Sequence, residues 1–305
     1  MAKGKSGICL ARGNSEGRLV TKIYGKVTSY SDDPIEKKPL YHFLPGRKVF
    51  SIGSWGCNLK CTFCQNWSIS QAADVMSEEF TPAEITELAL HSGAAGIAYT
   101  YNEPSIWYEF VMDVSEKARE KGLKNIWVTN GFISEEPLKE ALPRIDAMNI
   151  DLKAGSESFY REVCSGQLAP VMRTIKTAYE AGVHIEVTNL VIPDLNDKED
   201  IDGIIDWLAS VSPDIPMHFS RYSPQYKMNI DATGAEKLRE VYEKAKQKLK
   251  YVYLGNVPPE NGGSDTYCAS CGNELIKRDF YRAETTGLEG NKCTKCGEEV
   301  KGVFE

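Results

Sequence analysis

The sequence predicts an α/β fold: a partial (β/α)6 barrel, similar to a TIM barrel, with a small four-cysteine metal-binding appendage. Six short β-rich runs alternate with six stretches of helical periodicity, which is typical of parallel strands joined by helices. Polar or glycine-containing stretches follow these runs, at the strand ends where such folds gather their chemistry. Two Cys-x2-Cys pairs stand apart near the C-terminus and indicate the appendage.

The six predicted strands are rich in branched and aromatic residues. They are KVFSIGSW (48–55), GIAYTY (96–101), NIWVTN (125–130), IDAMNIDLK (145–153), HIEVTNLVIP (184–193) and PMHFSRYSP (216–224). Several of the predicted helices between them open at a Ser, Thr or Asp and close at a glycine. These helices are 81–93, 103–122, 134–144, 158–182, 197–210 and 233–249.

Two flanking regions differ from this repeat. Residues 1–48 lack clear periodicity, so we expect them to form an extension that wraps around the barrel of residues 49–255. Residues 256–305 begin with the Pro/Gly-rich linker NVPPENGGSD and continue as the four-cysteine tail. A chain of 305 residues is long enough for one large α/β domain and such an appendage.

Charge and hydropathy argue against some classes of function. The formal net charge of −7 gives no field that would recruit nucleic acid, and no apolar run has the length of a membrane span. The N-terminal MAKGKSGICL lacks the apolar segment of a signal peptide, so we expect a cytoplasmic protein. Clustered cysteines in that compartment bind metal more often than they form disulfides.

The stretch GSWGCNLKCTFCQNWS places Cys57, Cys61 and Cys64 on one short loop after the first predicted strand. A closed structural zinc site needs a fourth ligand, which Cys9, Cys164 or a histidine could supply. A cubane iron–sulfur cluster gives a better account, because three thiolates can hold it and leave one iron open to a small molecule. Phe63 would place a flat apolar face beside the metal.

This Cys-x3-Cys-x-aromatic-Cys loop resembles the signature of the radical S-adenosylmethionine (SAM) superfamily. Together with CQNWSISQ, TYNEP, VTNGF, DLK and HFSRYSP, it resembles the AmmeMemoRadiSam-system branch, which is similar to pyruvate formate-lyase activating enzymes. The resemblance implies a [4Fe-4S] cluster whose open iron binds SAM. It also implies a low-potential electron donor, ferredoxin or flavodoxin, and a 5′-deoxyadenosyl radical that abstracts hydrogen from a substrate.

The resemblance also implies a set of SAM contacts at the strand ends. The YNEP loop, with Tyr101, Asn102 and Glu103, matches the place where activating enzymes receive the SAM amino group. Thr129 and Asn130 match the ribose-contacting strand end, although Val128 stands where activating enzymes have an aspartate. Further contacts are expected from the Asp-x-Lys pair and from the fifth strand: Asp151, Lys153, Asn189 and Val191.

Structural explanations for the same residues stay open. Glu103 and Pro104 could mark a helix start, and Asp151 with Lys153 could be a buried ion pair. His218 and Arg221 could line the site, although a lone histidine on a strand is more often structural. Ser223 stands in place of a histidine of activating enzymes, and Cys164 is interpreted as a packing thiol.

The C-terminal pairs CASCG and CTKCG resemble a zinc ribbon or rubredoxin. Cys268, Cys271, Cys293 and Cys296 would bind structural zinc, and a single iron used in electron transfer is the alternative. Because so short a tail cannot build its own core, metal binding and folding should be one event.

Three hypotheses for function remain. The first is a radical SAM oxidoreductase of the activating-enzyme type that acts on a protein, for example by making a glycyl radical. The second uses the same cofactors on a small molecule or nucleotide. The third is a non-catalytic iron–sulfur or zinc scaffold, which would not need the polar strand ends at YNEP, TNG and DLK. The sequence does not identify the substrate.

Overall fold

The central feature of the fold is an eight-stranded sheet with the order β12-β11-β10-β9-β8-β7-β5-β4. A computed structural model describes residues 1–258 and 262–305. In this order the strands from β12 to β5 run parallel to one another, and β4 at the edge pairs antiparallel with β5. The strands are β4 (Ser29–Pro34), β5 (Lys48–Gly53), β7 (Gly96–Tyr99), β8 (Lys124–Thr129), β9 (Ala147–Asp151), β10 (His184–Val191), β11 (Met217–Arg221) and β12 (Val252–Gly255).

Helical segments connect these strands, as predicted. They are α1 (Trp67–Ser70), α2 (Pro82–His91), η2 (Pro104–Trp107), α3 (Tyr108–Glu120), α4 (Glu135–Ala141), η3 (Leu142–Arg144), α5 (Glu157–Phe159), η4 (Tyr160–Cys164), α6 (Leu168–Glu180), α7 (Glu199–Val211) and α8 (Ala235–Ala245). Local sequence explains their ends: Thr81 and Glu84 form a capping box at the start of α2.

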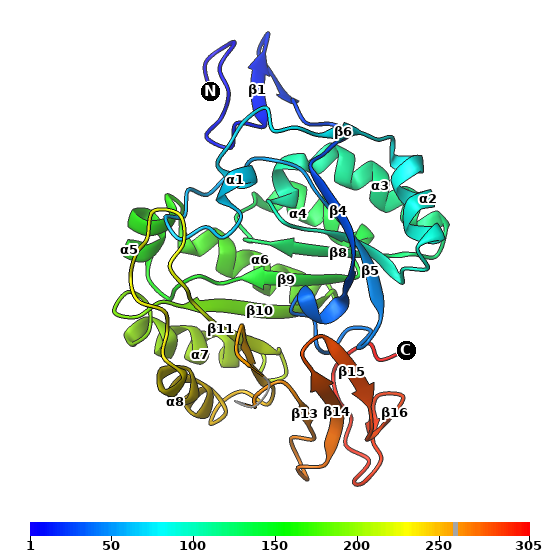
Figure 1. The fold of residues 1–305 in the computed structure, drawn as a ribbon, viewed down its shortest axis with the longest axis vertical. Coiled ribbons are helices and arrows are strands. Elements are labelled where there is room, and N and C mark those ends of the chain that lie inside the picture. Colours follow the sequence, from blue (N-terminus) through cyan, green and yellow to red (C-terminus); the bar gives the residue numbers. More distant parts are fainter. Residues whose placement is uncertain (259–261) are drawn as a thin grey trace.

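The six predicted strands are all present, and the sheet has two further strands that were not predicted. The polar segment β4 comes from the N-terminal region and extends the sheet beyond β5 (Figure 1). The short β12 follows α8 and pairs with β11 at the other edge. Apart from the antiparallel β4, the strands of the sheet are parallel, which confirms the prediction of a parallel α/β sheet. Among the described residues no strand pairing joins β4 to β12, so the sheet is open at both edges.

The predicted helix over 158–182 is instead broken into three pieces. A π-helical turn, η4, ends at Cys164, and Ser165 follows in the left-handed region with φ 54°. Such π turns frequently lie at functional sites. The break brings the chain back against the cysteine loop before α6 begins.

Both faces of the sheet are covered by apolar residues. One face packs against the helices in a continuous core that includes Phe110 and Trp127. On the other face small inward residues such as Ala98 and Ala147 pack against residues of the N-terminal segment, which are Ile35, Leu40, Phe43 and Leu44. The N-terminal segment therefore fills one end of the inner face and leaves the strand carboxyl ends open.

Smaller strands complete the structure. The N-terminal hairpin consists of β1 (Arg12–Ser15) and β2 (Arg18–Thr21), β3 (Lys26–Val27) pairs with β6 (Glu78–Glu79), and η1 spans Ile35–Lys37. The C-terminal ribbon contains β13 (Thr266–Tyr267), β14 (Glu274–Asp279), β15 (Arg282–Thr285), β16 (Leu288–Glu289) and β17 (Lys292–Cys293), and it lies below the sheet in Figure 1. Residues 259–261 of the predicted linker lie outside the described residues.

None of the described helices combines the length and the apolar character that crossing a membrane requires.

A buried polar cluster lies beneath the inner face. The Glu186 carboxylate accepts hydrogen bonds from the His42 backbone N–H at 2.7 Å and contacts His218 Nε2 at 2.6 Å. The His42 ring is fully buried and contacts the Tyr253 hydroxyl at 2.6 Å, and burial lowers the pKa of His42 to about 4. This cluster joins the sheet to the N-terminal segment.

We expect the stability of the protein to fall between about pH 6.5 and pH 4 because of His42. In the unfolded chain this histidine binds a proton near pH 6.5, whereas the folded protein keeps it neutral until about pH 4. Acidification therefore favours unfolding by on the order of 3 kcal/mol across this window. Urea unfolding of His42→Gln should show a flatter pH dependence, and the exposed His91→Gln variant should keep the wild-type slope. Equal slopes in all three proteins would contradict this assignment.

Candidate active site

A cavity of about 600 Å³ opens at the carboxyl ends of the parallel strands, which is the size of an ordinary small-molecule site. Its walls come from the cysteine loop after β5, the loops after β7 and β8, and the ends of β9, β10 and β11. Most of the residues predicted to form the site line this cavity: Cys57, Cys61, Phe63, Cys64, Tyr101, Asn102, Glu103, Thr129, Asn130, Asp151 and Lys153.

The cysteine loop is held close to the N-terminal segment. Gly56 has φ +87°, and a Cβ there would lie 2.3 Å from the Cys9 carbonyl oxygen, so only glycine fits. The Cys61 thiol is buried, and Cys57 and Cys64 are partly buried. Burial raises the pKa of Cys57 and of Cys64, and a hydrogen bond to Cys164 together with burial raises the pKa of Cys61. Metal binding at this loop would therefore displace protons from the thiols.

The structure brings one group of cysteines close enough to bind a single metal ion. Around tetrahedral zinc with Zn–S bonds of about 2.3 Å, sulfur atoms lie about 3.8 Å apart. Among the described residues, the group that fits this size is the C-terminal set, whose ligand atoms lie within 4.8 Å of one another. Cys57, Cys61 and Cys64 do not belong to that group and line the cavity instead.

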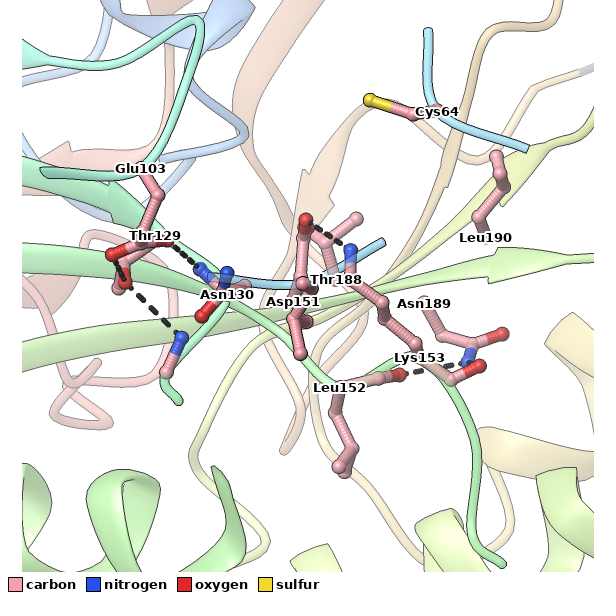
Figure 2. A network of polar contacts seen from close by, with 12 residues as sticks. Cys64, Glu103, Thr129, Asn130, Asp151, Leu152, Lys153, Thr188, Asn189 and Leu190 are labelled. Atoms are coloured by element: carbon pink, nitrogen blue, oxygen red, sulfur yellow. Dashed lines mark hydrogen bonds and ion pairs between the residues drawn. The ribbon is translucent and has the colours of Figure 1, made fainter. Parts of the chain in front are cut away.

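Glu103 joins the ends of two strands. Its carboxylate is buried and accepts hydrogen bonds from the Thr129 hydroxyl and the Asn130 backbone N–H, both at 2.8 Å (Figure 2). Burial raises the pKa of Glu103. The hydrogen bonds that its carboxylate accepts lower this pKa, but they offset only part of the effect of burial. Glu103 also caps η2 by accepting from Ser105 N, so it does mark a helix start while its carboxylate faces the cavity.

Tyr101 and Asn102 fix the loop that carries Glu103. Tyr101 adopts φ 68°, and its carbonyl oxygen accepts a hydrogen bond from Asn66 at 2.7 Å. The Asn102 side chain accepts from the Ser54 N–H and donates to the carbonyls of residues 55 and 56. Asn102 therefore holds the start of the cysteine loop against the loop after β7.

Asp151 and Lys153 both reach the cavity, as their alternation with Leu152 predicts (Figure 2). Lys153 Nζ lies 2.9 Å from Asp151 Oδ2 and 5.8 Å from the centre of the Phe63 ring. Burial lowers the pKa of Lys153, but the negative charge of Asp151, which also accepts a hydrogen bond from Lys153, outweighs it and holds that pKa well above its usual value. Lys153 is therefore a permanent cation beside the cysteine loop.

Asn189 and Val191 do not line the cavity; Thr188 and Leu190 line it from β10. Side chains alternate along a strand, so the neighbours of Asn189 face inward. The Asn189 amide instead donates to the backbone oxygens of Leu152 and Lys153, at 2.8 and 3.0 Å (Figure 2). The residues of β10 that line the cavity are therefore the sequence neighbours of the two predicted ones.

His218 and Arg221 do not line the cavity either. His218 is buried against Glu186. Arg221 donates from Nε to the Thr233 carbonyl oxygen at 2.9 Å.

The sequence reasoning missed several residues that line the cavity. They include Lys37, Lys38, Pro39, Ser220, Asn256 and Tyr281. Asp33 binds both lysines, at 2.8 and 2.7 Å, and accepts from the Tyr101 hydroxyl at 2.8 Å. These residues come from the N-terminal segment and the C-terminal ribbon, which no local pattern in the sequence connects with the strand ends.

The C-terminal cysteines form a compact four-sulfur group. Cys268 Sγ lies 3.6 Å from Cys296 Sγ, and Cys271 Sγ lies 3.8 Å from Cys293 Sγ, close to the tetrahedral spacing of about 3.8 Å. Burial would raise the pKa of Cys293, yet backbone N–H groups of residues 295 and 296 lower it to about 6. The chain thus carries a second, separate metal-binding group of the size that one metal ion needs.

A mostly parallel α/β sheet with three cysteines and a polar cavity at the carboxyl ends of its strands is typical of one class of cluster-binding enzymes. Comparison with known families assigns this chain to that class. Residues 52–208 match the family described as the Radical SAM superfamily, and the chain belongs to that superfamily. Over 99% of its length it is 45% identical to an uncharacterized protein, MJ0808, of Methanocaldococcus jannaschii, covering 92% of that protein.

More distant relatives carry names of activating enzymes. The pyruvate formate-lyase-activating enzyme of Clostridium pasteurianum is 22% identical over 64% of this chain and 84% of its own length. The benzylsuccinate synthase activating enzyme of Thauera aromatica is 23% identical over 73% of this chain and 74% of its own length. SuiB of Streptococcus suis bound to S-adenosylmethionine shares the fold with a TM-score of 0.56, at 15% identity, over 77% of this chain and 56% of SuiB.

Proposed function

We propose that Cys57, Cys61 and Cys64 hold a [4Fe-4S] cluster and that the cavity beside them binds SAM. The observation that carries the proposal is the loop itself: its three thiols line a cavity of about 600 Å³ at the carboxyl ends of the parallel strands, in a chain of the Radical SAM superfamily. When bound, the cluster and SAM supply reductive cleavage of SAM to a 5′-deoxyadenosyl radical, the chemistry of this superfamily. A non-catalytic scaffold would leave this polar cavity without a purpose.

The lining residues of the strand-end loops suit different parts of SAM. Lys153, a permanent cation near Cys61, suits the SAM carboxylate. Carbonyl and carboxylate acceptors of the loop 101–103 suit the amino group, and Thr129 and Asn130 suit the ribose. Glu103 reaches the ligand partly through Thr129 and Asn130, because its carboxylate already accepts their hydrogen bonds.

The lining residues outside the strand-end loops suit the substrate. Lys37, Asn256 and Tyr281 offer a cation, an amide and an aromatic ring at the cavity wall. The names of the activating-enzyme relatives support a protein substrate on which a radical is placed. A small molecule or nucleotide is the alternative, and a cavity of this size accommodates one. In either case the electron comes from a low-potential donor such as ferredoxin or flavodoxin.

We propose that the C-terminal group binds structural zinc, with a single iron as the alternative. Its sulfur spacing fits one tetrahedral ion.

Anaerobic reconstitution with iron and sulfide tests the proposed function. The reduced protein should show a [4Fe-4S] EPR signal that changes when SAM is added, and it should release 5′-deoxyadenosine. A glycyl doublet on a candidate partner would identify the activating type, whereas deuterium transfer from a small molecule would identify the alternative. If the EPR signal of the reconstituted cluster does not change when SAM is added, the proposal is wrong.

Replacing Lys153 with methionine should weaken SAM binding by roughly 10- to 100-fold. Loss of a charge-assisted hydrogen bond of about 1.5–3 kcal/mol accounts for this size. Lys37→Met is the matched control, since it removes a different cation that lines the same cavity. SAM titrations followed by EPR, at equal iron content, measure both variants. If Lys153 is only the structural partner of Asp151, SAM affinity will not change while stability falls.

A further inference from the structure

Each sulfur of the cysteine loop has a polar neighbour. Cys57 Sγ accepts from the Leu59 N–H at 3.4 Å and from Asn130 Nδ2 at 3.5 Å. Cys64 Sγ lies 3.0 Å from the Ser70 hydroxyl, and the Cys164 thiol is the neighbour of Cys61 and raises its pKa. Ser70 and Cys164 come from outside the Cys-x3-Cys-x2-Cys motif; Ser70 lines the cavity beside Cys64, and Cys164 is not among the lining residues.

Cys164 is placed against Cys61 by the backbone. The Lys60 N–H donates to the Cys164 carbonyl at 2.7 Å, and the Thr62 N–H donates to the Val163 carbonyl at 3.1 Å. These two bonds flank Cys61 on both sides and pin it to the end of the π turn η4, where the Cys164 side chain is fully buried. A Cβ on Gly166 would lie 2.4 Å from the Leu59 side chain, so the segment after η4 also fits closely against the loop.

The proton of Ser70 is directed at Cys64 by a neighbour. Gln71 Nε2 donates to the Ser70 oxygen at 3.2 Å, which leaves the single hydroxyl proton free to donate elsewhere. Ser70 is buried, and its hydroxyl oxygen lies within hydrogen-bond distance of the Cys64 sulfur. When Cys61 and Cys64 are thiolates they cannot donate, so Cys164 and Ser70 must be the donors in both contacts.

We propose that Cys164 and Ser70 are positioning residues that donate hydrogen bonds to the Cys61 and Cys64 thiolates and thereby raise the reduction potential of the cluster. The proposal rests on the proposed function, which places a [4Fe-4S] cluster on these thiolates. Reduction adds negative charge that spreads onto the ligand sulfurs, and donors to those sulfurs stabilise the reduced state more than the oxidised state. The two donors would make electron entry from the external donor easier.

The test is an EPR-monitored redox titration of the reconstituted full-length protein. Cys164→Ala and Ser70→Ala should each titrate at a more negative potential than wild type, at the same iron content. Cys164→Ser keeps a donor and should stay closer to wild type than Cys164→Ala. Cys9→Ala is the matched control, because Cys9 is a similarly buried thiol whose sulfur lies beside Gly7 rather than the loop, and it should not shift the potential.

The outcomes separate the two proposals. Unchanged potentials in both alanine variants, with full iron content, overturn the inference and leave the cluster assignment standing. A wild-type protein that holds no cluster overturns the proposed function itself. If Cys164→Ala loses iron, Ser70→Ala decides: a more negative potential supports the inference, and a wild-type potential overturns it.

Discussion

Replacing Cys61 with alanine should reduce iron loading and 5′-deoxyadenosine release to background. Cys61 is the most buried of the three loop thiols and is fixed between two backbone hydrogen bonds. A cluster held at only two corners is not retained, and the loss should exceed the roughly 10- to 100-fold effect of removing an outer-shell partner. Iron and sulfide content, EPR and product release measure the effect.

The metal proposed for the C-terminal cysteines provides an internal control for this variant. Its four cysteines belong to a separate part of the structure, so Cys61→Ala should keep the ribbon metal. Cys9→Ala should load iron and release 5′-deoxyadenosine as wild type does. If Cys61→Ala keeps a full cluster that responds to SAM, the cysteine loop does not bind the cluster as proposed.

The predicted site residues that line the cavity share one property: their placement depends on local order along the chain. The cysteine loop, the YNEP loop, and the pair Asp151 and Lys153 all follow predicted strands, and parallel strands bring their carboxyl ends to one edge. Asn189 and Val191, whose SAM contacts stay a prediction, do not line the cavity because their side chains alternate with those of Thr188 and Leu190.

The parts that were missed depend on tertiary contacts. The segment SYSDDP reads as a polar loop, yet it forms β4 because an edge strand exposes one side to water. Tyr281 reaches the cavity only because the ribbon docks on the N-terminal segment. Cys164 looked like a packing thiol, and its contact with Cys61 follows from the π turn, which has no signature in the sequence.

Removing the C-terminal metal should destabilise the whole protein by more than about 3 kcal/mol, because the ribbon anchors the N-terminal segment through Arg278. The Arg278 guanidinium donates to the Tyr41 carbonyl at 2.6 Å, stacks 4.2 Å from the Tyr41 ring, and lies 3.9 Å from the buried Glu36 carboxylate. Loss of a buried partner of this kind costs about 3–5 kcal/mol. Cys293→Ser, which removes a buried ligand, should unfold at lower urea concentration than wild type.

The same variant should also change the cavity. Glu36 precedes Lys37 and Lys38, and Tyr281 lies in the hairpin between β14 and β15, so a detached ribbon loosens three lining residues at once. Hydrogen exchange over residues 35–46 should become faster, while the SAM affinity changes little. Lys295→Ala, an exposed change between the two ligands, should match wild type in both measurements. Wild-type stability and exchange in metal-free Cys293→Ser would show that the ribbon does not anchor this wall. Faster exchange over residues 35–46 with an unchanged SAM affinity would mean that the metal acts on this wall of the cavity through structure alone.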